Sequence, residues 1–188
     1  MNAAENKDTD FSWREFIYSH NSELLGAFGN LVNRTLKFIE KYYDRHIPVG
    51  RIEKNIQEKV KNLYFFVGNQ IEKASFKRAL EEIFLFIRES NKYFDQHQPW
   101  KKIVDEKNIC DQAIANCVFI IANLSQLLHP FLPFTSSKLK EILKINNIKW
   151  EPIFPQSINL ENVEPLFERI DINQIDEEIK KLNEQANK

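Results

Sequence analysis

The sequence predicts an all-α protein, and three observations carry that prediction. Only four of the 188 residues are glycine, 28% are charged, and the apolar residues recur at the spacing of amphipathic helices. A sandwich or barrel of this length would need many more turn residues. We therefore expect an all-α bundle of about five core helices, followed by an extended C-terminal strap and a final helix.

The chain divides by composition into three parts. We expect residues 1–10 to be a disordered or added N-terminal segment, 11–148 to form the helical bundle, and 149–188 to form the strap and the last helix. A chain of this length is sufficient for one domain with an appendage.

The first long helix is interrupted near its start. Residues 11–21 predict a short helix, and Ser22 is a candidate cap at which a longer helix begins. The longer helix runs from Leu24 to about Tyr43, because its apolar residues follow the 3.6-residue period. It ends in "HIPVG", where a proline disfavours helix at the preceding residue and a glycine permits a turn.

Two further helices follow, separated by a turn. The second is expected over 52–71, and the third starts after Ser75, a candidate cap, and continues through Asp95. The proline of "HQPW", residues 97–100, breaks the third helix and places Trp100 at a helix-to-helix corner.

The fourth helix, about 108–128, is apolar nearly all round, which predicts the central element of the bundle. "HPFLPF" closes it, and a fifth helix is expected over about 135–145.

The C-terminal part changes character from residue 150 onward. Proline, asparagine and glutamate with scattered apolar residues predict an extended strap over 150–171, held by anchors such as Phe154 and Phe167. A last acidic helix is expected over 175 to about 185, amphipathic enough to fold back on the bundle.

Charge and cysteine content exclude several classes of protein. The net charge of −1 does not suit a polycation that coats any nucleic acid, although 34–61 holds eight Lys or Arg against four Asp or Glu. Cys110 and Cys117 have no zinc spacing and are expected to be buried thiols in a reducing compartment. The polar N-terminus and the polar interruptions of the most apolar run, 113–134, predict a cytoplasmic protein without a membrane span.

One exposed strip of the first long helix carries unusual residues. At 100° per residue, Asn30, Arg34, Lys37 and Lys41 fall within about 60° of one another and about 110° from the centre of the apolar stripe. An amide beside a guanidinium is suited to reading base edges, and the lysines to meeting phosphates. The alternative is that Asn30 and Arg34 are only solvated surface residues or partners for carboxylates on a neighbouring helix.

Trp100 is followed at once by Lys101 and Lys102. A large aromatic beside cations at a corner suits stacking on an unpaired base. The alternative is a tryptophan that plugs the end of the bundle.

No catalytic or metal-binding pattern is present in the sequence. There is no glycine-rich phosphate loop, nucleophile elbow or metal-spaced cluster, and the four histidines are dispersed. We expect no catalytic residue, no metal ligand and no cofactor in this chain.

Several segments resemble one family in the correct order. "NSELLGAFGNLVNRTLKFI", "NKYFDQHQPWK", "LLHPFLPFTSSKL" and "EPLFERID" are similar to the anticodon-binding domain of methionyl-tRNA synthetases over about residues 10–172. By that resemblance Asn30 and Arg34 match the pair that hydrogen-bonds anticodon bases, and Trp100 matches the aromatic on which the wobble cytosine stacks. Asn33, about 60° around the helix from Asn30, is interpreted as structural, a partner for the adjacent helix.

The resemblance implies RNA-binding residues Asn30, Arg34, Trp100, Lys37, Lys41 and Lys101. It implies the anticodon loop of tRNA(Met) and the catalytic domain of the synthetase as partners, and neither DNA nor a membrane.

The same resemblance bears on catalysis. The "HIGH"-like and "KMSKS"-like signatures of the family's catalytic domain, where ATP and Mg act in the full-length enzyme, do not occur here. We therefore expect this polypeptide alone to be inactive in methionine activation. Two alternatives stay open: the equivalent domain of a class I synthetase for Cys, Ile, Val or Leu, and a helical protein-interaction scaffold.

Overall fold

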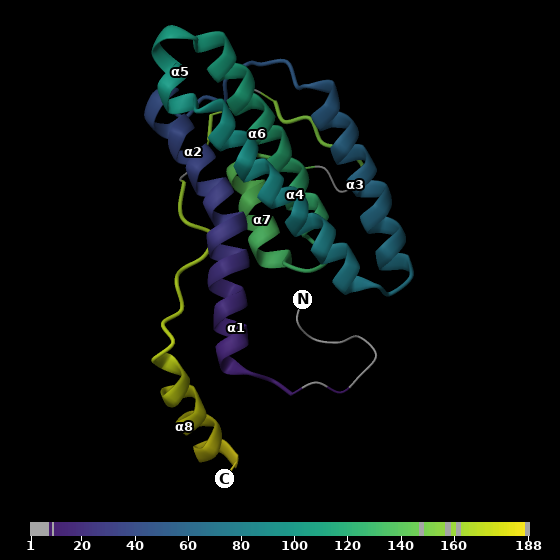
Figure 1. Cartoon of the computed structure of the whole chain (residues 1–188), viewed down its shortest axis with the longest axis vertical. Helices are drawn as coiled ribbons and strands as arrows, with labels where there is room; N and C mark the ends of the chain where they lie inside the picture. The colour runs from purple at the N-terminus through teal and green to yellow at the C-terminus, as the bar shows by residue number, and fades with distance from the viewer. Residues whose placement is uncertain (1–7, 9, 147–148, 157–158, 161–162, 187–188) are drawn as a thin grey trace.

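The described part of the chain folds as a bundle of helices in the computed structural model (Figure 1), which confirms the all-α prediction. The structure describes residues 8, 10–146, 149–156, 159–160 and 163–186. Within these residues no β-strand occurs, and the extended backbone forms one isolated antiparallel bridge between His46 and Asn159. The expectation for residues 1–10 falls almost entirely outside the described residues.

The first three helical segments form one continuous rod (Figure 1). They are α1 (Trp13–Ser19), the π-helical segment η1 (His20–Gly29) and α2 (Asn30–Tyr42). The prediction of a break with Ser22 as a cap is therefore wrong. The backbone stays in the right-handed helical region through the junction. The wider turns of the π-helical segment η1 therefore join α1 to α2 without interrupting the helix.

The rod begins at a different cap from the one expected. Ser12 has extended backbone angles, φ −118° and ψ 115°, and its side chain accepts a hydrogen bond from the Glu15 backbone N–H at 3.4 Å. This satisfies one of the free N–H groups of the first turn.

The remaining core helices agree with the sequence to within a few residues. They are α3 (Lys54–Glu72), α4 (Phe76–His97), α6 (Lys107–Leu127) and α7 (Pro133–Ile142). Ser75 does precede α4, but its side chain makes no capping hydrogen bond.

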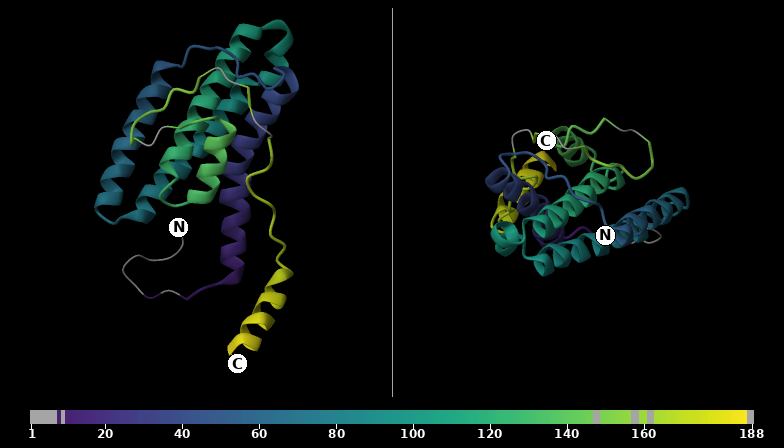
Figure 2. Two further views of the ribbon diagram at one scale, coloured as in Figure 1. Left: turned by 180° about the vertical axis from the view of Figure 1, so that it is seen from behind. Right: turned by 90° about the horizontal axis from the view of Figure 1, so that it is seen from above.

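A short helix, α5 (Pro99–Asp105), was not predicted. It lies at the same end of the bundle as the C-terminal half of α2 (Figures 1 and 2). Pro99 occupies its first turn, where the missing N–H costs nothing, and Gln98 turns the chain with a left-handed conformation, φ 43° and ψ 55°.

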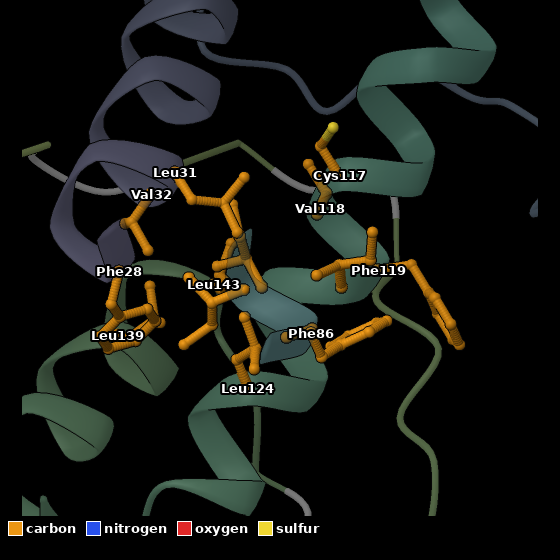
Figure 3. Packing of buried hydrophobic residues seen from close by; sticks show 14 of the residues in the cluster. Phe28, Leu31, Val32, Phe86, Cys117, Val118, Phe119, Leu124, Leu139 and Leu143 are labelled. Carbon is orange, nitrogen blue, oxygen red and sulfur yellow. The ribbon is translucent and has the colours of Figure 1, made fainter. Parts of the chain in front are cut away.

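The central helix α6 is buried along most of its length, as its apolar sequence predicts. Figure 3 shows the core between it, the rod and α7, where Phe28 and Leu31 face Val118, Leu124 and their neighbours. Cys110 and Cys117 are both buried and free, so the prediction of small buried thiols is confirmed.

Gly50 lets the α2–α3 connection approach this central helix. A Cβ added there would lie 2.8 Å from Ala115 Cβ and 3.0 Å from the backbone of Asp111 and Gln112. Only the absence of a side chain permits that approach.

The strap runs along the bundle, but one of its two expected anchors is wrong. Phe154 is 58% exposed, and its ring contacts the ring of Phe119, with centroids 5.0 Å apart. Ile153 is buried instead, because Asn123 accepts from its N–H at 2.8 Å and donates to its carbonyl at 2.9 Å. Successive side chains of an extended chain point to opposite sides, so burying Ile153 turns Phe154 outward.

The other anchor is confirmed. Phe167 packs against Phe28, with ring centroids 6.0 Å apart. Nearby, the Asn21 amide donates to the Ile170 carbonyl at 2.8 Å and accepts from its N–H at 3.0 Å. The strap is therefore fastened to the π-helical segment by both apolar contact and paired hydrogen bonds.

The last helix, α8 (Gln174–Ala186), extends past the α1 end of the bundle (Figures 1 and 2). The sequence left open whether this helix folds back on the bundle. It does not, because the strap is held along the rod as far as Ile170, so that α8 begins beyond the end of the rod. Among the described residues no helix is both long and apolar enough to cross a membrane.

Candidate nucleic-acid interface

The exposed strip of α2 is joined to α4 by two matched pairs of side chains. Asn30 donates from its amide nitrogen to Asn91 Oδ1 at 3.1 Å, and Arg34 forms an ion pair with Asp95 at 2.5 Å. Both pairs join residues 61 apart, and each helix contributes residues one turn apart. The two pairs therefore hold α2 and α4 side by side and parallel to each other.

Arg34 also lies over two aromatic rings. Its guanidinium carbon is 4.5 Å from the centroid of Phe94 and 5.8 Å from that of Trp100, distances typical of cation–π contacts. The two rings are themselves stacked, with centroids 6.0 Å apart and planes inclined by 30°. The structure therefore brings Arg34 and Trp100, 66 residues apart in the numbering, to one place.

Trp100 is not a fully buried plug, because 42% of it is exposed. Its position depends on the corner that precedes α5. Pro99 is buried, and the thiol of Cys110 donates to the Pro99 carbonyl at 3.6 Å. The corner thus presents the indole at the surface while its proline is packed inside.

Tyr43 braces the same end of the bundle. Its hydroxyl donates to Asp111 at 2.6 Å and contacts the Cys110 sulfur at 3.3 Å. Burial, followed by these two hydrogen bonds, raises the pKa of Tyr43 well above its ordinary range. The hydroxyl therefore remains a protonated donor at neutral pH.

The orientation of the Asn30 amide follows from its neighbour. Asn91 donates from its own amide nitrogen to the carbonyls of Ala27 at 3.0 Å and Ile87 at 3.2 Å. Asn91 therefore turns its oxygen towards Asn30, which must donate to it. This leaves the Asn30 oxygen as an acceptor for another molecule.

The predicted lysines differ in whether they pair with a carboxylate. Lys37 forms an ion pair with Glu40 at 2.7 Å, and the hydrogen bond from Lys37 is the main reason that the pKa of Glu40 is lowered. Lys41 lies over the Tyr42 ring at 5.0 Å. Neither Lys41 nor Lys101 has a carboxylate partner in the described part of the chain, and both are exposed.

The structure supports one part of the alternative interpretation of the strip. Arg34 does pair with a carboxylate of a neighbouring helix, as the alternative stated, yet it also lies beside Trp100 on an open surface. The interpretation of Asn33 as a partner for the adjacent helix is wrong, since Asn33 is exposed.

Sequence reasoning missed three residues around the strip: Asn91, Asp95 and the buried Phe94 beneath Arg34. The spacing of Asn91 and Asp95, one helical turn, matches that of Asn30 and Arg34 and was the available signal. Phe94 is part of the apolar stripe of α4, so nothing in its spacing separates it from core residues.

The chemistry of the site suits an unpaired base better than a phosphate. Arg34 uses one of its donors on Asp95 and keeps others, while Asn30 offers an acceptor and Trp100 an exposed indole. Asp95 neutralises much of the Arg34 charge, which makes this part of the strip less attractive to a phosphate. Stacking on the indole and hydrogen bonding at the base edge are then both available.

Two family models match the chain. Residues 53–188 match the anticodon-binding domain of tRNA ligase, and residues 1–36 match tRNA synthetases class I (M). The first match covers most of the chain.

Curated relatives and solved structures agree with these matches. The chain is 56% identical over 97% of its length to a methionine–tRNA ligase of Bacillus mycoides (strain KBAB4) and 57% identical to that of Bacillus cereus (strain G9842). It spans 34% of the length of each. The crystal structure of apo methionyl-tRNA synthetase from Mycobacterium tuberculosis shares the fold, with a TM-score of 0.75 and 20% identity over 88% of this chain and 36% of that one.

Proposed function

Because this chain belongs to the family of anticodon-binding domains of tRNA ligases, we propose that it reads the CAU anticodon of tRNA(Met). The similarity to methionine–tRNA ligases of two Bacillus species supports methionine as the amino acid concerned. The chain spans about a third of those relatives, so this proposal concerns the recognition step.

The observation that carries the proposal is the position of Arg34 beside Trp100, with Asn30 one turn away. An exposed indole can stack on one unpaired base, which contributes about 1–3 kcal/mol per base. Arg34 and Asn30 then lie where they can meet the polar edge of that base.

The edge of cytosine is complementary to these groups. On its pairing edge cytosine presents the N4 amino donor together with two acceptors, the ring N3 and the carbonyl O2. The free Asn30 oxygen can accept from the amino group, and the remaining N–H groups of Arg34 can donate to the acceptors. Lys41 and Lys101, both exposed, supply positive charge for the flanking phosphates.

The module contributes selectivity to a larger enzyme. We assign the ATP- and Mg-dependent attachment of methionine to the catalytic domain of a complete synthetase, and no step of it to residues of this chain. The isolated module should bind RNA weakly, because its net charge is only −1 and its basic groups are local.

The α1 end of the bundle is the proposed contact with that catalytic domain. Phe11, Phe16 and Tyr18 are 66%, 48% and 74% exposed there, and the class I (M) family match covers this segment. Replacing Phe16 and Tyr18 by serine in a complete synthetase should lower aminoacylation without changing the affinity of the module for an anticodon stem-loop. Unchanged aminoacylation would overturn this assignment.

Titration with anticodon stem-loops tests the reading function. The module should bind a CAU stem-loop more tightly than a GAU stem-loop, and Trp100→Ala should weaken CAU binding about 5- to 160-fold, the loss of one stacked base. Phe65→Ala is the matched control, because Phe65 is an exposed aromatic of α3 away from the strip. Equal affinity for the two stem-loops, or no effect of Trp100→Ala, would overturn the proposal.

The same titration separates the other class I synthetases. Stem-loops with cysteine, isoleucine, valine and leucine anticodons should all bind more weakly than CAU. Tighter binding of any of them would replace methionine by that amino acid.

A further inference from the structure

We propose that a groove between the rod and the strap holds a second unstacked nucleobase of the same anticodon loop, and that Asn33 reads its edge. This rests on the proposed function, since it concerns another nucleotide of the RNA that Trp100 and Arg34 would bind. It assigns a role to a residue that the sequence suggested was structural.

The groove begins directly beside Asn30. It has a volume of about 460 Å³, within the range of about 300–1,000 Å³ typical of small-ligand sites. One wall comes from the rod and the other from the strap. Its lining residues are Leu25, Gly26, Gly29, Asn30, Asn33, Pro165, Leu166 and Phe167.

Asn33 differs from the other amides of the rod. Asn21 is engaged with the strap and Asn30 with Asn91. Asn33 is exposed, and its side chain makes no hydrogen bond with the described residues. Its two donors and its acceptor are therefore available at the mouth of the groove, where they match the mixed donors and acceptors of a base edge.

The wall formed by the rod allows a flat group to approach closely. Gly26 is exposed and has no side chain, and a Cβ added there would lie 3.0 Å from the Asn21 carbonyl oxygen. The π-helical backbone therefore presents a bare surface that most other residues could not maintain without a shift.

The wall formed by the strap supplies a fixed aromatic ring. Phe167 is held against Phe28 and against His20, with ring centroids 6.0 Å apart in both pairs. Its Cδ2 atom lies 3.1 Å from the position of a Cβ added at Gly29, so the ring lines the groove close to the rod. An aromatic ring beside free amide groups is the combination that unpaired bases meet in RNA-binding proteins.

The groove adjoins the site formed by Arg34 and Trp100, and this indicates which ligand would occupy it. Asn30 lines the groove and lies one helical turn before Arg34. Asn33 lies about 60° around the helix from Asn30, on the strap side of the strip. A base in the groove would thus be close to the base at Trp100, as expected for neighbouring nucleotides of one splayed loop and not for a separate ligand.

A double-mutant cycle between protein and RNA tests the proposal. The Kd of a CAU stem-loop is measured for the unchanged module and for Asn33→Ala, and again with RNAs in which each unpaired loop position is made abasic in turn. Asn33→Ala should weaken binding of the intact loop about tenfold. With one abasic position adjacent to the cytosine, the same substitution should have no effect.

Asn62→Ala provides the matched control, because Asn62 is an exposed amide of α3 on a different surface. Trp100→Ala is measured in parallel to separate this inference from the proposed function. If Trp100→Ala weakens binding and Asn33→Ala does not, or if every abasic RNA keeps the full Asn33 effect, the second base site is wrong. If neither substitution changes binding, the proposed function itself fails.

Discussion

Arg34 and Asp95 form an ion pair that lies at the edge of an aromatic surface, with the guanidinium over Phe94 and close to Trp100. The arginine is thereby held in one place while part of its donor set stays available. Asp95 is 58% exposed at its side chain, so the pair is also accessible to any molecule that reaches the indole.

Replacing Asp95 by asparagine should affect RNA binding more than folding. The exposed ion pair contributes about 0–1 kcal/mol to stability. Removing its negative charge should strengthen binding of both CAU and GAU stem-loops by less than about 1 kcal/mol, which is the Coulomb energy of two charges about 4 Å apart in water, because the phosphates lie farther from Asp95 than the bases do. Titration at low and high salt measures this. Glu89→Gln, which interrupts the pair with Lys59 elsewhere on α4, is the control, and a weaker complex with Asp95→Asn would contradict the expectation.

Gln98→Gly should stabilise the corner that carries Trp100. Gln98 adopts the left-handed conformation at φ 43°, which costs a residue with a Cβ about 1–2 kcal/mol, partly offset by the greater unfolded-state entropy of glycine. We expect a net gain of up to about 1 kcal/mol in the free energy of unfolding in urea. Ala74→Gly, at φ 54° between α3 and α4, should give a similar gain. A loss of stability would mean that the Gln98 side chain makes a contribution of its own.

Asn123→Ala should release the strap from the central helix. The Asn123 side chain is buried and makes paired hydrogen bonds with the backbone of Ile153. Its removal leaves a buried N–H and a buried carbonyl without those partners, at a cost of about 2–4 kcal/mol. Urea unfolding measures the loss, and limited proteolysis should cut the strap sooner than in the unchanged protein. With the exposed Asn62→Ala as the reference, an equally small effect of both would show that Asn123 does not hold the strap.

Stability should fall at alkaline pH. Burial raises the pKa of the Cys117 thiol to about 12 and also raises the pKa of Tyr93. A raised folded-state pKa means that the folded chain holds protons that the unfolded chain releases. The contribution to stability is therefore complete below the unfolded-state pKa, and is lost as pH rises from about 9 towards 12.

The pH dependence of urea unfolding measures this loss. Cys117→Ala should reduce the slope above pH 9 by up to about 1.4 kcal/mol per pH unit, because one titrating group is removed. Cys117 in the folded protein should also resist thiol-alkylating reagents. A stability that stays constant to pH 11, or rapid labelling of the native thiol, would contradict the burial on which the prediction depends.

Local pattern determined most of the helices and one half of the site. The apolar period located α2, α3, α4, α6 and α7, and proline located the corner before Trp100. The same period placed Asn30 and Arg34 on one strip of α2, where both are half-buried. These features depend on residues a few positions apart, whose relative directions are fixed by helix geometry itself.

Only the tertiary structure decided which groups meet across the bundle. The partners Asn91 and Asp95, the approach of Arg34 to Trp100, the outward turn of Phe154 and the groove beside Asn33 all join segments far apart in sequence. A helical period specifies which face is buried but not which neighbour covers it. That choice is made by the packing of whole helices and by the hydrogen bonds of the strap, so it could not be derived from spacing along the chain.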